Sequence, residues 1–203
     1  MTVQIKEVKN QKELKCFVKF PLELYKDCQY YVPPLLKREM TMLDPEKNPS
    51  FEVCDVKLWL AYIDNKVVGR IAGIIHKPFI EKWGNRYARF GWFDFIDDEQ
   101  VATALLQTVE NWASENGMEA IHGPLGFTDF DPEGILIEGF NELATIVERY
   151  NYPYYACYIE KNGYYKDADW LEYEIEVPSK FASITIPGQS KRGSFGFEKS
   201  ILP

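Results

Sequence analysis

The stretch RYARFGWFDFIDDEQVATALLQTVENWASENGMEAIH, from Arg86 to His122, decides the fold. Its first part, Arg86 to Ile96, is rich in aromatic residues and predicts a β-strand. A helix is predicted over Asp98 to Asn116, because apolar residues recur on one helical face and Gly117 follows as a stop signal. Ala120 to His122 is typical of a short buried strand. Since a long helix joins the two strands, we expect them to be parallel neighbours in one sheet.

Upstream of this stretch, the sequence predicts an antiparallel meander. Val56 to Ile63 and Lys66 to His76 are rich in β-branched and aromatic residues, and Asp64-Asn65 between them suits a two-residue hairpin turn. The segment that leads to the next strand contains Pro78 and Trp83-Gly84-Asn85 and is predicted to be a loop. Gly91, in the middle of that strand, indicates a bulge or the close approach of another backbone or ligand.

The N-terminal region predicts one strand and two helices. The strand covers Val3 to Val8, and Asn10 with Glu13 resembles a capping box for the first helix. Pro21 is expected to interrupt that helix, with a further turn or two after it. A second helix is predicted to begin at Pro33-Pro34 and to stop at Asp44-Pro45.

Downstream of His122, the signals are weaker. Gly123 to Phe140 is rich in Gly, Pro and Asp and predicts a long structured loop, followed by a helix near Asn141 to Arg149. A last helix is expected over Pro153 to Asn162, and Trp170 to Val177 alternates like a closing strand. We therefore predict one domain over residues 1–177. Residues 178–203 lack a periodic apolar face and are predicted to be a tail, a truncated or altered C-terminal region with a weak edge strand over Ala182 to Ile186.

Composition narrows the class of protein. The 203 residues are 46% hydrophobic and 27% charged, as in an ordinary globular domain. The net charge of -8 opposes binding to nucleic acid, which depends on an excess of Lys and Arg. No signal peptide or membrane span is recognised, so a cytoplasmic location is expected. Four scattered cysteines and two distant histidines predict reduced thiols and no metal site.

The order of predicted elements resembles the GNAT (N-acetyltransferase) superfamily. Four segments sharpen the likeness to a bacterial branch of GNAT-like proteins: Tyr31 to Leu35, Leu43 to Pro49, Val68 to Ala72, and Gly123 to Phe127. The resemblance covers about Val3 to Val177. It implies an α/β (α+β) GNAT-like acyl-CoA N-acyltransferase fold, in which a mixed, mostly antiparallel sheet is flanked by helices. It also implies acyl transfer from a CoA thioester to an amine.

In that family, acyl-CoA is held by the strand before the long helix and by the turn that follows it. The strand residues here would be Phe90, Gly91, Trp92, Phe93 and Phe95. The turn normally reads Gln/Arg-x-x-Gly-x-Gly/Ala and wraps the pyrophosphate at the helix N-terminus.

The corresponding turn positions here are Asp97, Gln100 and Ala102, of which only Ala102 fits. Asp97, Asp98 and Glu99 would repel phosphate by about 1 to 4 kcal/mol per charge pair at ~4 Å. Asp97 with Gln100 also resembles a capping box. The resemblance implies acetyl-CoA or another acyl-CoA as cosubstrate, but because of these acids we expect acetyl-CoA to bind weakly or not at all.

Candidate catalytic residues follow from the same resemblance. An amine acceptor needs a base, for which Asp94 or His122 is a candidate. The family's tyrosine acid falls at Ile159, so Tyr158 or Tyr155 would replace it. Each also has a structural interpretation: Asp94 as an outward-facing polar residue, His122 as a hydrogen-bonded histidine, and the tyrosines as packed side chains.

A further candidate site is the acidic loop from Thr128 to Glu138, which carries four carboxylates around Gly134 and the aromatic neighbours Phe127 and Phe130. It either presents carboxylates to a cationic amine or reflects turn chemistry. The four carboxylates are Asp129, Asp131, Glu133 and Glu138.

Two functions remain open from the sequence. One is an N-acyltransferase acting on a small-molecule amine, with a degenerate pyrophosphate loop. The other is a catalytically inactive GNAT-like module that binds a ligand or a protein, including a second copy of itself. Relatives of the family that use aminoacyl-tRNA lack the pyrophosphate loop, but the acidic charge disfavours RNA.

Overall fold

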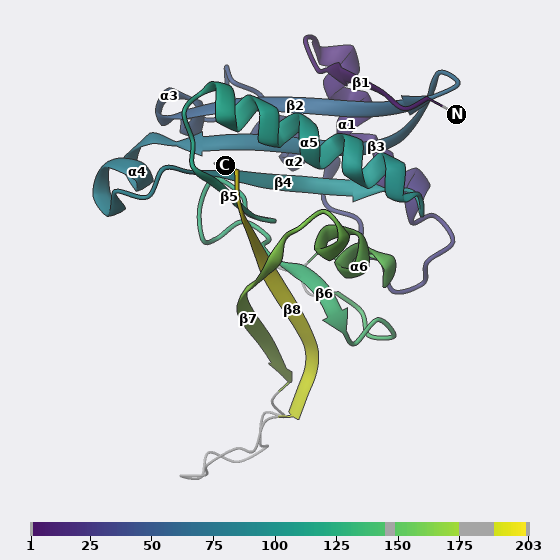
Figure 1. Cartoon of the computed structure of the whole chain (residues 1–203). Helices are drawn as coiled ribbons and strands as arrows, with labels where there is room; N and C mark the ends of the chain where they lie inside the picture. The colour runs from purple at the N-terminus through teal and green to yellow at the C-terminus, as the bar shows by residue number, and fades with distance from the viewer. Residues whose placement is uncertain (1, 145–148, 175–188, 202–203) are drawn as a thin grey trace.

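The computed structural model describes residues 2–144, 149–174 and 189–201. Its described strands form one mixed sheet in the order β1-β2-β3-β4-β5-β8-β6, with β7 paired to β8 (Figure 1). Helix α5 lies across one face of the central strands, and α1 and α2 lie behind them. The predicted mixed, mostly antiparallel sheet flanked by helices is confirmed.

The meander is confirmed in its order and pairing. Strands β2 (Cys54–Ile63) and β3 (Lys66–His76) form an antiparallel hairpin. Its turn residues Asp64 and Asn65 have φ of 48° and 62°, the left-handed values that a tight hairpin turn requires. Strand β1 (Gln4–Glu7) pairs with β2, and β4 (Tyr87–Phe95) pairs with β3, both antiparallel.

Helix α5 (Glu99–Glu115) makes the expected crossover from β4 to β5 (Ala120–Gly123). These two strands are parallel, with Tyr87 opposite Ala120 and Arg89 opposite His122. Their pairing ends at Arg89, so the second half of β4 diverges from β5. The predicted parallel neighbours are confirmed.

Helix α1 (Gln11–Leu24) begins at the predicted cap, where the side chain of Asn10 accepts a hydrogen bond from the N–H of Glu13. The expected interruption at Pro21 is wrong, because the helix continues to Leu24. Proline leaves the carbonyl four residues earlier without its helical donor. That carbonyl, of Phe17, instead accepts a hydrogen bond of 3.0 Å from Arg70. The chain then enters α2 (Leu36–Met42) and α3 (Ser50–Val53).

The loop predicted around Pro78 contains a helix, α4 (Lys77–Trp83). Proline is compatible with the first turn of a helix, where backbone N–H groups have no helical acceptor. The side chain of His76 caps this helix by accepting from the N–H of Phe79, and Gly84 ends it at φ 76°.

The segment after β5 departs from prediction in two places. It contains a short strand, β6 (Ile135–Glu138), within the expected loop. The helix predicted near residues 141–149 is absent from 141–144 and from 149, while 145–148 lie outside the described residues. Helix α6 (Tyr154–Lys161) is confirmed and is followed by Gly163 at φ 83°.

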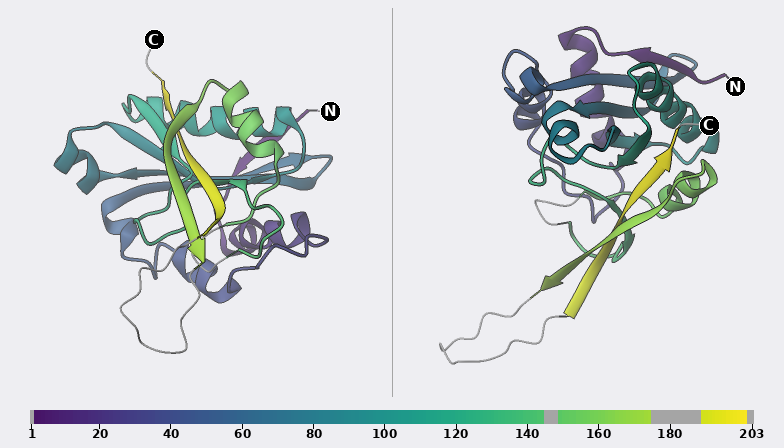
Figure 2. Two further views of the ribbon diagram at one scale, coloured as in Figure 1. Left: turned by 90° about the horizontal axis from the view of Figure 1, so that it is seen from below. Right: turned by 60° about the vertical axis from the view of Figure 1, so that its left-hand side comes forward.

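The C-terminal part forms a long antiparallel ribbon of β7 (Tyr165–Glu174) and β8 (Gln189–Ser200), visible in Figure 2. The expected closing strand therefore begins earlier than Trp170. Residues 189–200, within the predicted tail, form β8, which lies between β5 and β6 in the sheet, and Phe197 is fully buried. The predicted boundary between residues 177 and 178 and the weak edge strand over 182–186 lie outside the described residues, so the division into domain and tail stays a prediction.

Candidate functional site

A bulge in β4 sets the orientation of the candidate site. Arg70 pairs with Asp94 and Ala72 with Gly91, so one extra residue lies on β4 between these pairs, and Trp92 takes a φ of 44°. Gly91 also meets another backbone, because a Cβ added there would collide with the carbonyl oxygen of Leu125. Both the predicted bulge and the predicted close approach of another backbone are thus found at Gly91.

The bulge divides the β4 side chains between two cores. Phe90, Phe93 and Phe95 join the core beneath α5, whereas Trp92 joins the core beneath α1 and α2. We therefore find the predicted donor-binding aromatics packed as core.

Asp94 is buried, with 6% of its surface exposed, so the interpretation as an outward-facing residue is wrong. Its Oδ2 lies 2.7 Å from both Nε and Nη2 of Arg70, and the hydroxyl of Tyr25 donates to its Oδ1 at 3.0 Å. Arg70 is itself fully buried and stacks on the ring of Phe17 at 5.1 Å. The carboxyl group of Asp94 is thus held beneath α1 by a buried arginine.

A chain of hydroxyl groups continues from Asp94 to the edge of β4. The hydroxyls of Tyr25 and Tyr155 are 2.7 Å apart, and Tyr155 accepts from the N–H of Phe95 at 3.1 Å. The carbonyl of Phe95 accepts from Tyr154 at 2.6 Å. Burial raises the pKa of Tyr25 and of Tyr155 well above the usual range, with Asp94 contributing, so both hydroxyls stay protonated.

Asp94 lines a cavity of about 350 Å³ between α1, α2 and the loop at Phe130. A second buried carboxylate, Glu39, also lines it and accepts from Trp92 Nε1 at 2.9 Å and from Arg149 at 3.3 Å. Burial would raise the pKa of Glu39, but Arg149, the more distant Arg70 and these hydrogen bonds outweigh burial and hold it below its usual value. The cavity lining thus carries two carboxyl groups, Asp94 and Glu39, together with three arginines, Arg38, Arg70 and Arg149.

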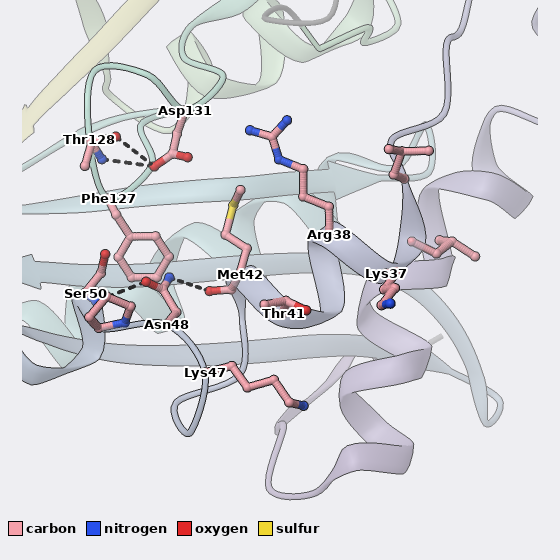
Figure 3. Close-up of a pocket in the computed structure, with 13 residues that line it drawn as sticks. Lys37, Arg38, Thr41, Met42, Lys47, Asn48, Ser50, Phe127, Thr128 and Asp131 are labelled. Carbon is pink, nitrogen blue, oxygen red and sulfur yellow. Dashed lines mark hydrogen bonds between the residues drawn. The ribbon is translucent and has the colours of Figure 1, made fainter.

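A wider groove of about 800 Å³ adjoins this cavity across α2 (Figure 3). Leu35, Arg38 and Met42 line both hollows. Figure 3 shows Arg38 and Met42 extending from α2 toward the loop that carries Thr128 and Asp131. The groove is mainly apolar, with Leu36, Pro49 and Phe127 among its lining residues.

His122 lies apart from this cavity. It pairs with Arg89 in the sheet register, and its ring lies between those of Phe79 and Tyr87, at 5.8 and 5.7 Å. Its Nε2 is buried without a hydrogen-bond partner among the described residues. Burial, with the nearby Arg89, lowers the pKa of His122 to about 4. The structure thus does not bring His122 to Asp94.

At the start of α5, each of the three acids has a partner. Asp98, rather than the predicted Asp97, caps the helix by accepting from the N–H of Gln100 at 2.8 Å. Asp97 accepts a hydrogen bond of 2.7 Å from the hydroxyl of Tyr158. This hydrogen bond, together with partial burial, raises the pKa of Tyr158 to about 12. Glu99 forms an ion pair of 2.5 Å with Lys161.

Two further residues of this turn differ in burial. Gln100 carries an exposed side chain, and Ala102 is fully buried in the core.

The acidic loop owes part of its sequence to turn structure. Asp131 accepts from the N–H of Thr128 at 3.0 Å, and Phe127 is buried. Phe130 is 92% exposed and lines the mouth of the cavity. Burial, with Asp129, raises the pKa of Glu133.

Sequence reasoning missed Tyr25, Glu39, Arg70 and Arg149. The four lie on four different segments and meet only through the tertiary fold, so no spacing in the sequence relates them. The one local signal was Pro21, whose missing N–H frees the carbonyl that anchors Arg70.

Comparisons with known proteins place this geometry in context. No family model matches the chain. It is 34% identical over 167 residues to Protein YghO of Escherichia coli (strain K12), covering 82% of this chain and 43% of that protein. It is 28% identical over 170 residues to the Bacterial ceramide synthase of Caulobacter vibrioides (strain NA1000 / CB15N), covering 83% and 44%. The chain thus spans less than half the length of these curated relatives.

Among solved structures, an aminoglycoside 6'-N-acetyltransferase complexed with coenzyme A matches at a TM-score of 0.53 and 16% identity, covering 100% of this chain and 98% of that one. No helix among the described residues is long and apolar enough to cross a membrane. No group of three or more His, Cys, Asp or Glu side chains in the same part of the chain is arranged to hold a metal ion. An acetyltransferase of the GNAT family from Staphylococcus aureus Mu50 matches at a TM-score of 0.56 and 14% identity, covering 99% of this chain and 100% of that one, so the chain has the GNAT fold.

Proposed function

We propose that this chain carries the acyl-transfer site of an N-acyltransferase, which moves an acyl group from a thioester donor to an amine. The observation that carries the proposal is Asp94, an arginine-paired carboxylate beside the β4 bulge that lines a cavity large enough for a small head group. The name of one relative, a ceramide synthase, supports it, because a ceramide is an amide of a long-chain amino alcohol.

In the proposed reaction, the amine enters the cavity as the neutral base, because three arginines, Arg38, Arg70 and Arg149, line it beside only two carboxyl groups. The amine nitrogen attacks the thioester carbonyl carbon, and Asp94 takes one proton from that nitrogen. The new C–N bond forms, the C–S bond breaks, and the thiolate is protonated by Tyr155, with Tyr158 as the alternative acid. The products are an amide and a free thiol.

The acceptor that fits best is an amphiphilic amine. The cavity supplies carboxylates for the amine, and the apolar groove beside it supplies room for a hydrocarbon chain. Because Leu35, Arg38 and Met42 line both hollows, one molecule can extend from the cavity into the groove. Burial of each CH₂ group there contributes about 0.8 kcal/mol.

The donor is proposed to be recognised through its acyl and pantetheine parts. The start of α5 offers carboxylates rather than backbone amides to a pyrophosphate, so CoA would gain little there. At Phe95, the strand-edge amide and carbonyl are already bonded to Tyr155 and Tyr154. A donor that uses this edge must displace those hydroxyls.

The same occupation of Phe95 favours a second candidate function. If α6 stays on the strand edge, the chain is a catalytically inactive GNAT-like module that binds an amine or a protein in the cavity. The two functions differ in whether an amide product forms.

The test is incubation of the chain with palmitoyl-CoA and sphinganine, a long-chain amino alcohol, followed by mass spectrometry of the lipid products. If the proposal is right, N-palmitoyl sphinganine forms, and the Asp94→Asn variant does not form it. Asp55→Asn is the matched control, since Asp55 is an exposed acid paired with Lys77. Calorimetric binding of sphinganine without any amide product would establish the binding module instead. Equal product from the Asp94→Asn variant would refute the role of Asp94.

A further inference from the structure

We propose that Tyr25 is a proton-relay residue that joins Asp94, in the acceptor cavity, to Tyr155 at the edge of β4. The inference rests on the proposed function and deepens it, because it assigns the path that returns the proton from the base to the acid. Sequence patterns pointed to Asp94 and Tyr155 but not to Tyr25. The structure adds Tyr25, because its hydroxyl lies within hydrogen-bond distance of both Asp94 and Tyr155.

The path runs where β4 and β5 diverge. Pairing of these strands ends at Arg89, and the N–H of Phe95 bonds to Tyr155 from α6 instead of to β5. Tyr25, near the end of α1, reaches the same place from the other side of the sheet. The relay therefore passes around the strand edge and links the two faces of β4.

The position of every proton in the relay follows from the donors and acceptors. The N–H of Phe95 only donates, so the oxygen of Tyr155 accepts. The carboxylate of Asp94 only accepts, so Tyr25 donates its hydroxyl proton there. In the remaining hydrogen bond, 2.7 Å between the two hydroxyls, Tyr155 must then be the donor and Tyr25 the acceptor. The resting order is Phe95 N–H to Tyr155, Tyr155 to Tyr25, and Tyr25 to Asp94.

The surroundings isolate this path from solvent. Tyr25 and Tyr155 are each 1% exposed, and both rings pack among other tyrosines and Phe95. Arg70 binds Oδ2 of Asp94 and leaves Oδ1 to Tyr25. Because a buried tyrosinate is costly, protons move along such a chain in concert rather than through a charged tyrosine.

During turnover, the direction of donation between Tyr155, Tyr25 and Asp94 is reversed. Asp94 takes one proton from the nitrogen of the neutral acceptor amine as it attacks, and the two hydroxyls rotate. Protonated Asp94 then donates to Tyr25, Tyr25 donates to Tyr155, and Tyr155 donates to the departing thiolate. One proton leaves the amine nitrogen and one arrives on sulfur, so both tyrosines and the Asp94 carboxylate are regenerated.

The kinetic test uses Tyr25→Phe, with palmitoyl-CoA and sphinganine as substrates. Removing the hydroxyl breaks the path, so kcat should fall on the order of 10²-fold while KM changes little. The dependence of kcat on the D₂O fraction should change from curved, with several protons in flight, to linear. Tyr152→Phe is the control, because its ring packs on Tyr25 at 5.1 Å while its hydroxyl bonds outside the relay, to the carbonyl of Leu24. A Tyr25→Phe variant with wild-type kcat and the same curved dependence overturns the proposal.

A second test needs no turnover. In ¹⁵N-labelled protein, Asp94→Asn should shift the amide proton of Phe95 through the hydroxyl chain, and the shift should be much smaller when Asp94→Asn is made in the Tyr25→Phe background. An equal shift in both backgrounds overturns the relay even if the chain acylates amines. An intact relay shift without any amide product overturns the proposed function instead, and with it the use of the relay in catalysis.

Discussion

Replacing Arg70 with methionine should destabilise the chain more than the loss of an ordinary ion pair. Arg70 and Asp94 are both buried, 1% and 6% exposed, and the guanidinium makes two contacts of 2.7 Å with the carboxylate. Removing one partner of a buried pair leaves an uncompensated charge and typically costs about 3 to 5 kcal/mol. Because Tyr25 still donates to Asp94 in the variant, we expect the lower end, about 3 kcal/mol.

The assay is urea unfolding followed by tryptophan fluorescence, applied to Arg70→Met, Asp94→Asn and the double variant. The double variant should be more stable than the sum of the single losses predicts, by about 2 kcal/mol, because neither charge is then left alone. Lys77→Met is the control, since the exposed pair of Lys77 with Asp55 should contribute less than about 1 kcal/mol. If Arg70→Met costs no more than Lys77→Met, the buried pair does not hold this site together.

Three further predictions follow from the same structure. Gly91→Ala should lower stability by about 2 kcal/mol or more, because its Cβ would collide with the carbonyl oxygen of Leu125; an unchanged urea midpoint would show that the contact is relaxed at no cost. Burial and Arg89 lower the pKa of His122 to about 4 from 6.5, so the unfolded chain binds the proton first as pH falls. The free energy of unfolding should therefore keep its full value above pH 6.5 and fall toward pH 4, by at most about 3 kcal/mol. Between pH 7 and pH 5, the free energy of unfolding of the His122→Gln variant should change less than that of the unmodified chain. Acetyl-CoA should bind weakly to the unmodified chain, and Asp97→Arg with Gln100→Gly should tighten it in a salt-dependent way by calorimetry; micromolar binding by the unmodified chain would contradict this.

The sequence predicted the parts of the fold that depend on local patterns. The hairpin turn at Asp64-Asn65, the cap at Asn10 and the apolar face of α5 are written in neighbouring residues, and all three are confirmed. Strand β8 was missed because its partners, β5, β6 and β7, lie at three different places in the chain, and a Gly- and Ser-rich strand has little apolar pattern of its own.

The candidate site was predictable only in part. Asp94 was identified from its strand, but its burial depends on Arg70, Tyr25 and the bulge at Gly91 acting together. The capping residue at α5 was displaced by one position, because Asp98 rather than Asp97 takes the extended backbone conformation of a cap.

The measurement that tests the central claim most directly is the rate of thiol release from palmitoyl-CoA in the presence of sphinganine, compared between the unmodified chain and Asp94→Asn. The proposal predicts amine-dependent thiol release that matches amide formation and falls by on the order of 10²-fold or more in Asp94→Asn, while circular dichroism shows the fold retained. Amine-dependent release within threefold of the unmodified rate in a folded Asp94→Asn variant would contradict the claim that Asp94 is the base.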